Sequence, residues 1–124
     1  MKVELRQILN AKDAIEHLLN QSMPMSISFT LSDLVQELNP KIDNFYEKQK
    51  VLLEKHGKLV DAEIGKYELD NVERYNKEID ELLDTMVKLT FEPIEYEKVK
   101  DVPILPVFVP ALKEFVVKNW KKNG

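Results

Sequence analysis

Hydrophobic residues recur at helical spacing over a long stretch in the first half of the chain. Between residues 28 and 57 they lie three and four positions apart, and one stripe holds Leu31, Leu38, Phe45 and Leu52. This pattern predicts one amphipathic helix about 40 Å long. Pro40 should kink it or split it in two, because proline lacks the N–H that a helix needs. Gly57 is expected to end it as a left-handed cap.

A second, shorter helical pattern covers residues 70–86. Asp70 and Glu73 have the spacing of a capping box. The hydrophobic positions that follow are Val72, Tyr75, Ile79, Leu82, Leu83 and Met86. Helices joined by a short connection most simply pair as an antiparallel hairpin. We therefore expect the two helices to bury their stripes on each other and to form the core.

The segment between these helices, residues 58–69, loses the helical period. It contains Gly65 within a polar stretch, between two short groups of hydrophobic residues. This composition is typical of either a β-hairpin or an ordered loop. Both alternatives stay open at this point.

The two ends of the chain predict smaller elements. Residues 1–27 contain a short strand and an amphipathic helix over residues 10–20, which Pro24 separates from the long helix. In residues 87–94 hydrophobic and polar residues alternate, as in a half-buried strand. Residues 102–122 begin with an extended proline-rich segment, and Pro110 could start a terminal amphipathic helix.

These elements predict a single domain of mainly α class (α+β), in which a long kinked helix is paired antiparallel with a shorter one. Small β elements and a C-terminal helix complete it. The chain has 124 residues, of which 44% are hydrophobic, and this suits one globular domain. It has no cysteine, which excludes disulfides and thiolate metal sites and suits a reducing compartment.

The charge and hydropathy of the chain limit the partners and the cellular compartment that we expect. The formal net charge of −4 argues against direct binding to nucleic acid, which normally requires a basic surface. The first residues lack the apolar run of a signal peptide, and no stretch reaches the roughly 18 apolar residues of a membrane span. We therefore expect a cytoplasmic protein without a membrane segment.

Catalytic and metal-binding patterns are missing from the sequence. His17 and His56 are the only histidines, and neither has a second ligand at zinc-site spacing. The three glycines lie too far apart for a phosphate-binding loop, and no serine has the context of a nucleophile. We expect a protein that is not an enzyme and that needs neither metal nor cofactor.

Residues 102–120 stand out because their hydrophobic residues come almost without alternation, so both sides of the segment need cover. A protein partner or a second copy of the chain could supply that cover, or the segment could wrap its own helical hairpin. The candidate contacts with a partner or a second copy are Ile104, Leu105, Phe108, Phe115 and Trp120.

Three stretches of the chain carry a resemblance to a known family. They are residues 46–57 (YEKQKVLLEKHG), residues 75–85 (YNKEIDELLDT) and residues 87–94 (VKLTFEPI). Their order resembles an uncharacterised family of small proteins encoded by phages and prophages of Gram-positive bacteria. The resemblance implies a phage or prophage setting and a location in the cytoplasm of the host cell. It implies no catalytic or binding residues.

Two functional hypotheses follow. The first is a non-enzymatic phage interaction protein that binds a host or phage protein, as an inhibitor of a host defence factor or as an accessory factor in particle assembly. The second is a protein that binds and sequesters a small nucleotide-like signal. Its candidate ligand contacts are Tyr46, Arg74 and Tyr75, which could stack on a base and pair with an anion.

Overall fold

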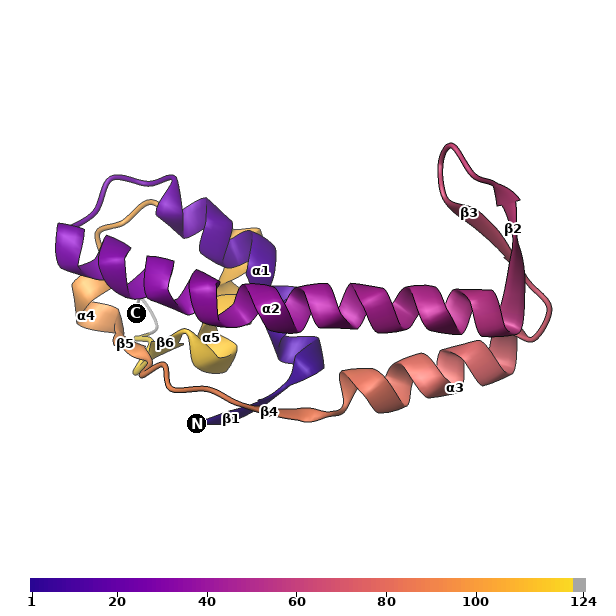
Figure 1. The fold of residues 1–124 in the computed structure, drawn as a ribbon. Helices are drawn as coiled ribbons and strands as arrows, with labels where there is room; N and C mark the ends of the chain where they lie inside the picture. The colour runs from indigo at the N-terminus through magenta and orange to yellow at the C-terminus, as the bar shows by residue number, and fades with distance from the viewer. Residues whose placement is uncertain (122–124) are drawn as a thin grey trace.

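A single long helix joins a body to a projecting arm in the computed structural model, which describes residues 1–121 (Figure 1). The first half of α2 (Met25–His56) packs with α1 (Leu5–Leu19) in the body, and its second half pairs with α3 (Val72–Leu83). We call residues 46–85 the arm and the other described residues, 1–45 and 86–121, the body. The remaining elements are β1 (Lys2–Glu4), β2 (Gly57–Asp61), β3 (Lys66–Leu69), β4 (Met86–Lys88), β5 (Ile94–Glu95), α4 (Tyr96–Val99), η1 (Pro106–Phe108), α5 (Val109–Phe115) and β6 (Val117–Lys118). The predicted mainly α class is confirmed.

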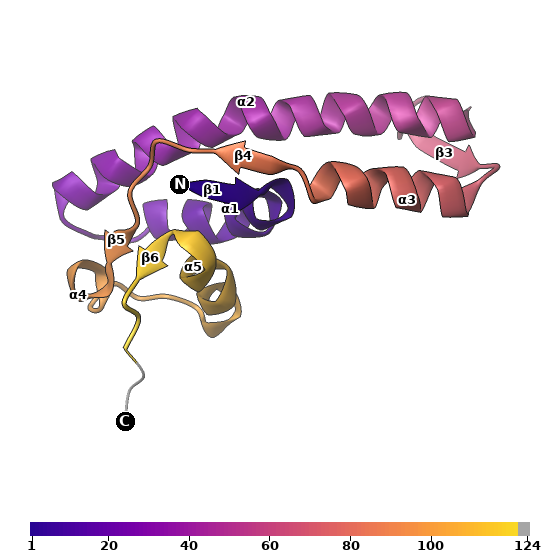
Figure 2. The same ribbon diagram turned by 90° about the horizontal axis from the view of Figure 1, so that it is seen from below.

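Helix α2 continues through Pro40 and is not split there. Proline has no N–H to donate to the carbonyl four residues earlier, so one hydrogen bond of the ladder is lost at Gln36. The helix changes direction near its middle (Figure 2), and Pro40 lies at the middle of its residue range. The prediction of a kink therefore fits the observed bend, whereas the alternative of two separate helices is wrong.

The core lies in the body and is not formed by the helical hairpin. Fully buried side chains come from α1, from the first half of α2 and from the C-terminal part of the chain, and include Ile8, Ile15, Leu18, Leu31, Leu34, Leu38, Val99 and Leu112. Helix α1 begins at Leu5, earlier than predicted, because Glu4 and Gln7 form a capping box. Helix α5 then packs on α1 from the far end of the sequence.

The predicted antiparallel pairing of α2 with α3 is present, but the prediction that this pair forms the core is wrong. No residue of α3 is fully buried, and Val72 at its start is about half exposed. Within the arm, His56 is the one buried residue, with 9% of its surface exposed. Two helices alone bury only the strip along which they touch, and no third layer covers the arm.

Residues 58–69 form the hairpin alternative, an antiparallel pair of β2 and β3. Gly65 turns it with a φ of 65°, in the left-handed region. Gly57 has a φ of −160° and is extended, so the predicted left-handed cap is wrong. A side chain at Gly57 would instead bring its Cβ within 2.5 Å of the Glu68 carbonyl oxygen, and this close approach of the two strands requires glycine.

Helix α3 begins one residue later than the predicted capping box implies. The side chain of Asn71 accepts a hydrogen bond from the backbone N–H of Arg74 at 3.1 Å, so Asn71 is the N-cap in place of Asp70. The last turn of the helix is followed by Asp84 and Thr85, which lead directly into β4. The helix is therefore shorter at both ends than the predicted range of residues 70–86.

Short strands tie the arm and the C-terminus to the body. Strand β1 pairs antiparallel with β4 and places Val3 opposite Val87. The predicted alternation along residues 87–91 is present, with Leu89 and Phe91 buried and Lys88 and Thr90 exposed. The predicted strand of residues 87–94 is longer than the observed β4, which has three residues and pairs with the three residues of β1.

The predicted terminal helix ends at Phe115 and does not reach Trp120. Beyond it, Val117 and Lys118 form β6, which pairs parallel with Ile94 and Glu95 of β5. Asn119 then takes a positive φ of 58°. The last predicted residue of this segment, at position 122, lies outside the described residues.

Candidate functional site

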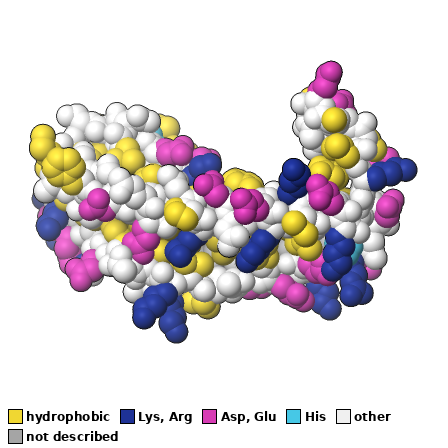
Figure 3. All heavy atoms as spheres, in the orientation of Figure 1, with side chains coloured by type: hydrophobic (Ala, Val, Ile, Leu, Met, Phe, Trp, Pro, Cys, Tyr) yellow, Lys and Arg dark blue, Asp and Glu magenta, His cyan; other side chains and the backbone are white. Residues whose placement is uncertain are grey.

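The arm presents an exposed hydrophobic surface on a helical support. Six of the twelve large hydrophobic side chains that are exposed in residues 1–121 lie on it: Tyr46, Val51, Leu59, Val60, Ile64 and Val72. Ile64 at the hairpin tip is 72% exposed and Val51 on α2 is 62% exposed. Hydrophobic side chains are visible on the projecting hairpin in Figure 3. We call these six residues the arm surface.

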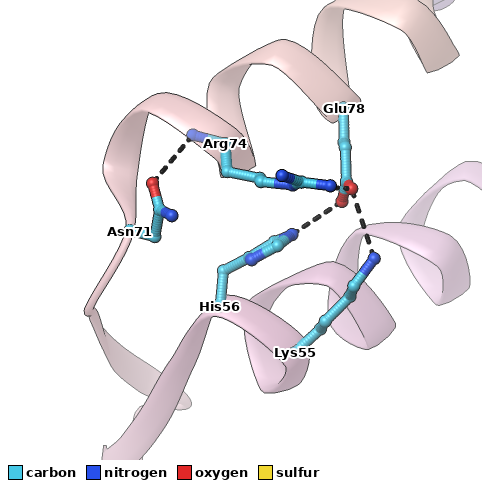
Figure 4. A network of polar contacts seen from close by, with 5 residues as sticks. All are labelled: Lys55, His56, Asn71, Arg74 and Glu78. Atoms are coloured by element: carbon cyan, nitrogen blue, oxygen red, sulfur yellow. Dashed lines mark hydrogen bonds and ion pairs between the residues drawn. The ribbon is translucent and has the colours of Figure 1, made fainter.

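A polar network at the end of α2 fixes the arm in place (Figure 4). The Nε2 atom of His56 lies 2.7 Å from Oε2 of Glu78 on α3, and Lys55 Nζ lies 3.2 Å from the other carboxylate oxygen. The His56 carbonyl also accepts hydrogen bonds from the backbone N–H groups of Asp70 and Asn71. One buried residue thus joins the end of α2 to both the hairpin exit and α3.

The chemistry of this network is that of a structural clamp. The hydrogen bond from His56, followed by that from Lys55, holds the pKa of Glu78 below its usual range. The carboxylate is therefore ionised at neutral pH, and Arg74 lies 3.9 Å away as a second cation beside Lys55. The described contacts of the His56 ring lead to this carboxylate and to no hydroxyl group that it could activate.

Acid should weaken this clamp, because the pKa of Glu78 is lower in the folded protein than its ordinary value. Such a group stabilises the fold above its ordinary pKa of about 4.3, and the stabilisation is lost as the pH falls through the lower pKa of the folded state. Urea unfolding at pH 7 should show wild type more stable than Glu78→Gln, and the difference should shrink progressively as the pH falls below the ordinary glutamate pKa. Glu81→Gln, an exposed substitution on the same helix, should show no such trend. A difference that persists unchanged in acid would contradict the clamp.

The three predicted ligand contacts have different neighbours in the structure. Tyr46 lies near Lys12 of α1, whose Nζ is 5.9 Å from the ring centroid. The hydroxyl of Tyr75 accepts a hydrogen bond from Gln49 at 3.4 Å, and the Arg74 side chain pairs with Glu78. No described contact joins Tyr46 to either of the other two.

The five predicted contacts near the C-terminus are mostly used inside the body. Phe115 is 4% exposed and belongs to the core, so it is unavailable to a partner. Three others, Ile104, Phe108 and Trp120, are partly buried against the core. Leu105 remains 54% exposed. The chain itself thus covers most of this segment, which was the alternative to a partner or a second copy.

Local contacts explain how the body covers this segment. The Phe108 ring lies 4.9 Å from that of His17, and His17 Nε2 accepts a hydrogen bond from the Leu105 backbone N–H at 3.2 Å. The Trp120 ring lies 5.0 Å from that of Tyr96. His17 therefore serves to attach the proline-rich segment to α1.

Residues 1–121 contain no group of three or more His, Asp or Glu side chains placed to hold a metal ion. In the same range, no helix combines the length and the apolar character needed to cross a membrane. Comparison of the chain with models of protein families, with curated proteins and with solved structures found no match.

Proposed function

We propose that this protein is a non-enzymatic interaction protein that docks a protein partner on its arm surface. One observation carries the proposal: the arm leaves six large hydrophobic side chains exposed, and His56 is its one buried residue. Leu59, Val60 and Ile64 lie close together in sequence on the β2–β3 hairpin, and an exposed hydrophobic cluster in a protein often marks a place where another protein binds. Hydrophobic groups on the arm would lose their contact with water only when a partner covers them.

The arm is also preorganised for binding. Helix α2 runs without a break from the core of the body into the arm, and the network around His56 and Glu78 fixes α3 to its end. A surface carried on rigid helices loses little conformational entropy when a partner docks. The hairpin projects sideways from the end of α2 (Figure 1), which places Leu59, Val60 and Ile64 where a partner can reach them.

The biological setting is part of the same proposal. The resemblance of residues 46–57, 75–85 and 87–94 to small phage and prophage proteins supports a role in the cytoplasm of an infected or lysogenic host. The partner would be a host or phage protein. Two of the resembling stretches lie within the arm, so the docking surface and the resemblance involve the same part of the chain. An inhibitor of a host defence factor and an accessory factor in particle assembly are the two roles that fit.

Site-specific photo-crosslinking in cells that express the protein tests this proposal. A photoreactive residue at Val51 or Ile64 should form an adduct with one discrete foreign protein, whereas the same residue at exposed Lys113 on α5 should not. The identified protein should then bind the purified chain, and Val60→Lys should weaken that binding by placing a charge in the interface. Equal labelling from Lys113, no adduct from the arm, or an adduct only with a second copy would each contradict the proposal.

A further inference from the structure

A hollow opens where the arm joins the body, away from the exposed hairpin tip. It has a volume of about 310 Å³ and lies between α2 and the segment that runs from the end of α3 into β4. Helix α2 contributes one face through Lys41, Asn44, Phe45 and Lys48, which are three or four positions apart. Leu82, Thr85, Met86, Val87 and Lys88 line the opposite side, and Leu5 completes it.

The hollow is basic although the protein as a whole is acidic. Three of its lining residues are lysines, and none of its lining residues is Asp or Glu. In the described part of the chain, Lys41, Lys48 and Lys88 form no ion pair, whereas Lys55 further along α2 pairs with Glu78. In the strip between α2 and the α3–β4 segment, Figure 3 shows dark blue side chains separated by yellow ones.

The strand pair beside the hollow adds to this positive charge. Lys2 of β1 lies directly opposite Lys88 of β4 in the antiparallel register. Like charges at opposed positions of a strand pair destabilise it. Lys2 is thus a fourth lysine beside the hollow that forms no ion pair in the described part of the chain, and a bound anion would reduce the repulsion between Lys2 and Lys88.

We propose that this hollow binds a small phosphorylated ligand of about the size of a mononucleotide. Phosphate oxygens would accept hydrogen bonds from the ammonium groups of Lys41, Lys48 and Lys88, and charge-assisted bonds of this kind are stronger than neutral ones. The Asn44 amide can donate another. Thr85 donates its hydroxyl proton to the Glu81 carbonyl, so it can only accept from the ligand.

The apolar lining of the hollow, which we call its floor, would contact the part of the ligand that is not phosphate. Leu5, Phe45, Leu82 and Val87 give it an apolar surface beside the lysines. Small-ligand sites typically combine such a surface with a few polar groups, in volumes of roughly 300–1,000 Å³. A free phosphate ion would use only the lysines, whereas a nucleoside phosphate would also cover the floor. The sequence does not indicate this site, because Lys88 lies 40 or more residues from Lys41 and Lys48 along the chain.

Calorimetric titration of the full chain with ATP, pyrophosphate and inorganic phosphate tests the proposal. ATP should bind most tightly and phosphate most weakly, and raising NaCl from about 0.05 to 0.5 M should weaken binding because salt screens exposed charges. The double substitution Lys48→Gln with Lys88→Gln should weaken ATP binding by about ten-fold or more. Lys50→Gln with Lys113→Gln is the matched control, since it also removes two charges, from exposed positions on α2 and α5 outside the hollow.

Several results would overturn the proposal. Absence of ATP binding at millimolar concentration would reject the site, as would an equal loss of affinity in the control pair (Lys50→Gln with Lys113→Gln) and in Lys48→Gln with Lys88→Gln. If pyrophosphate bound as tightly as ATP, the apolar floor would have no role in binding. An acidic peptide such as hexaglutamate that bound in place of ATP would reassign the lysines to a protein segment. Circular dichroism of each variant must match wild type, and none of these outcomes depends on the arm surface.

Discussion

Truncating Phe115 to alanine is expected to lower the free energy of unfolding by about 3–5 kcal/mol. Its ring is 4% exposed at the end of α5, and α5 packs on α1 in the body. Removing a buried ring loses its transfer from water and leaves a cavity that the surrounding side chains fill only in part. Urea unfolding followed by circular dichroism measures the change.

Leu105→Ala is the matched control for this prediction. Leu105 belongs to the same C-terminal segment and is also a large hydrophobic residue, but it is 54% exposed. Its truncation should change the free energy of unfolding by no more than about 0.5 kcal/mol, as is usual for surface substitutions. A comparable loss in both variants would mean that the segment is covered on both sides, and a small loss in Phe115→Ala would mean that Phe115 is not in the core.

The helices were predictable because their signals are local. Hydrophobic residues three and four positions apart fix a helix wherever it later packs, so α2, α3 and their antiparallel pairing could be read from the sequence. The β2–β3 hairpin was one of two alternatives, and Gly65 at a positive φ is the residue that makes its turn possible. The alternation along residues 87–91 likewise predicted which side chains are buried.

The location of the core could not be predicted in the same way. The stripe on α2 is equally hydrophobic in both halves, with Leu31 and Leu38 in the first and Phe45 and Leu52 further along. The first half becomes core because α1 packs on it, and α5, from the far end of the chain, packs in turn on α1. Beyond Phe45, which is still buried, α2 packs with α3 and with the β2–β3 hairpin, and most of its side chains stay at least partly exposed. Periodicity identifies a hydrophobic face, but it does not show how many elements pack against that face.

The errors at single residues have the same physical origin. Gly57 follows a helix, and the local pattern favours a left-handed cap, but its need for glycine comes from the Glu68 carbonyl eleven residues later. Helix α5 ends early because residues 117–118 pair with β5, which lies more than twenty residues before them. Contacts distant in sequence override local preference at both places.

The candidate sites were the least predictable part. Tyr46, Arg74 and Tyr75 were chosen for the chemistry of their side chains, and the fold directs them to separate neighbours. The arm surface was hidden in the sequence because its residues resemble core residues, and only the lack of a third layer exposes them. The lysines of the hollow are ordinary surface residues until α2 and β4 lie side by side.

Two separate variants, Leu34→Ala and Leu82→Ala, should show that the body contributes more to the free energy of unfolding than the arm does. Leu34 is 1% exposed in the first half of α2, and its truncation should lower the free energy of unfolding by roughly 2–5 kcal/mol. Leu82 on α3 is only partly buried against the core, so its truncation should lower it by about 1 kcal/mol. Chemical denaturation of both variants under identical conditions gives the comparison.

Hydrogen exchange should show where each of these losses occurs. Leu82→Ala should speed the exchange of amides in α3 and the second half of α2 while leaving those of α1 and α5 as slow as in wild type, because a region with few buried contacts opens separately. Leu34→Ala should speed exchange throughout the body. If Leu82→Ala instead lowered the free energy of unfolding as much as Leu34→Ala and affected every helix, the two-helix hairpin would be the core after all. The proposal that the arm surface docks a partner would then lose its main support. An arm that unfolds only together with the body must bury far more hydrophobic surface than its half-exposed side chains indicate.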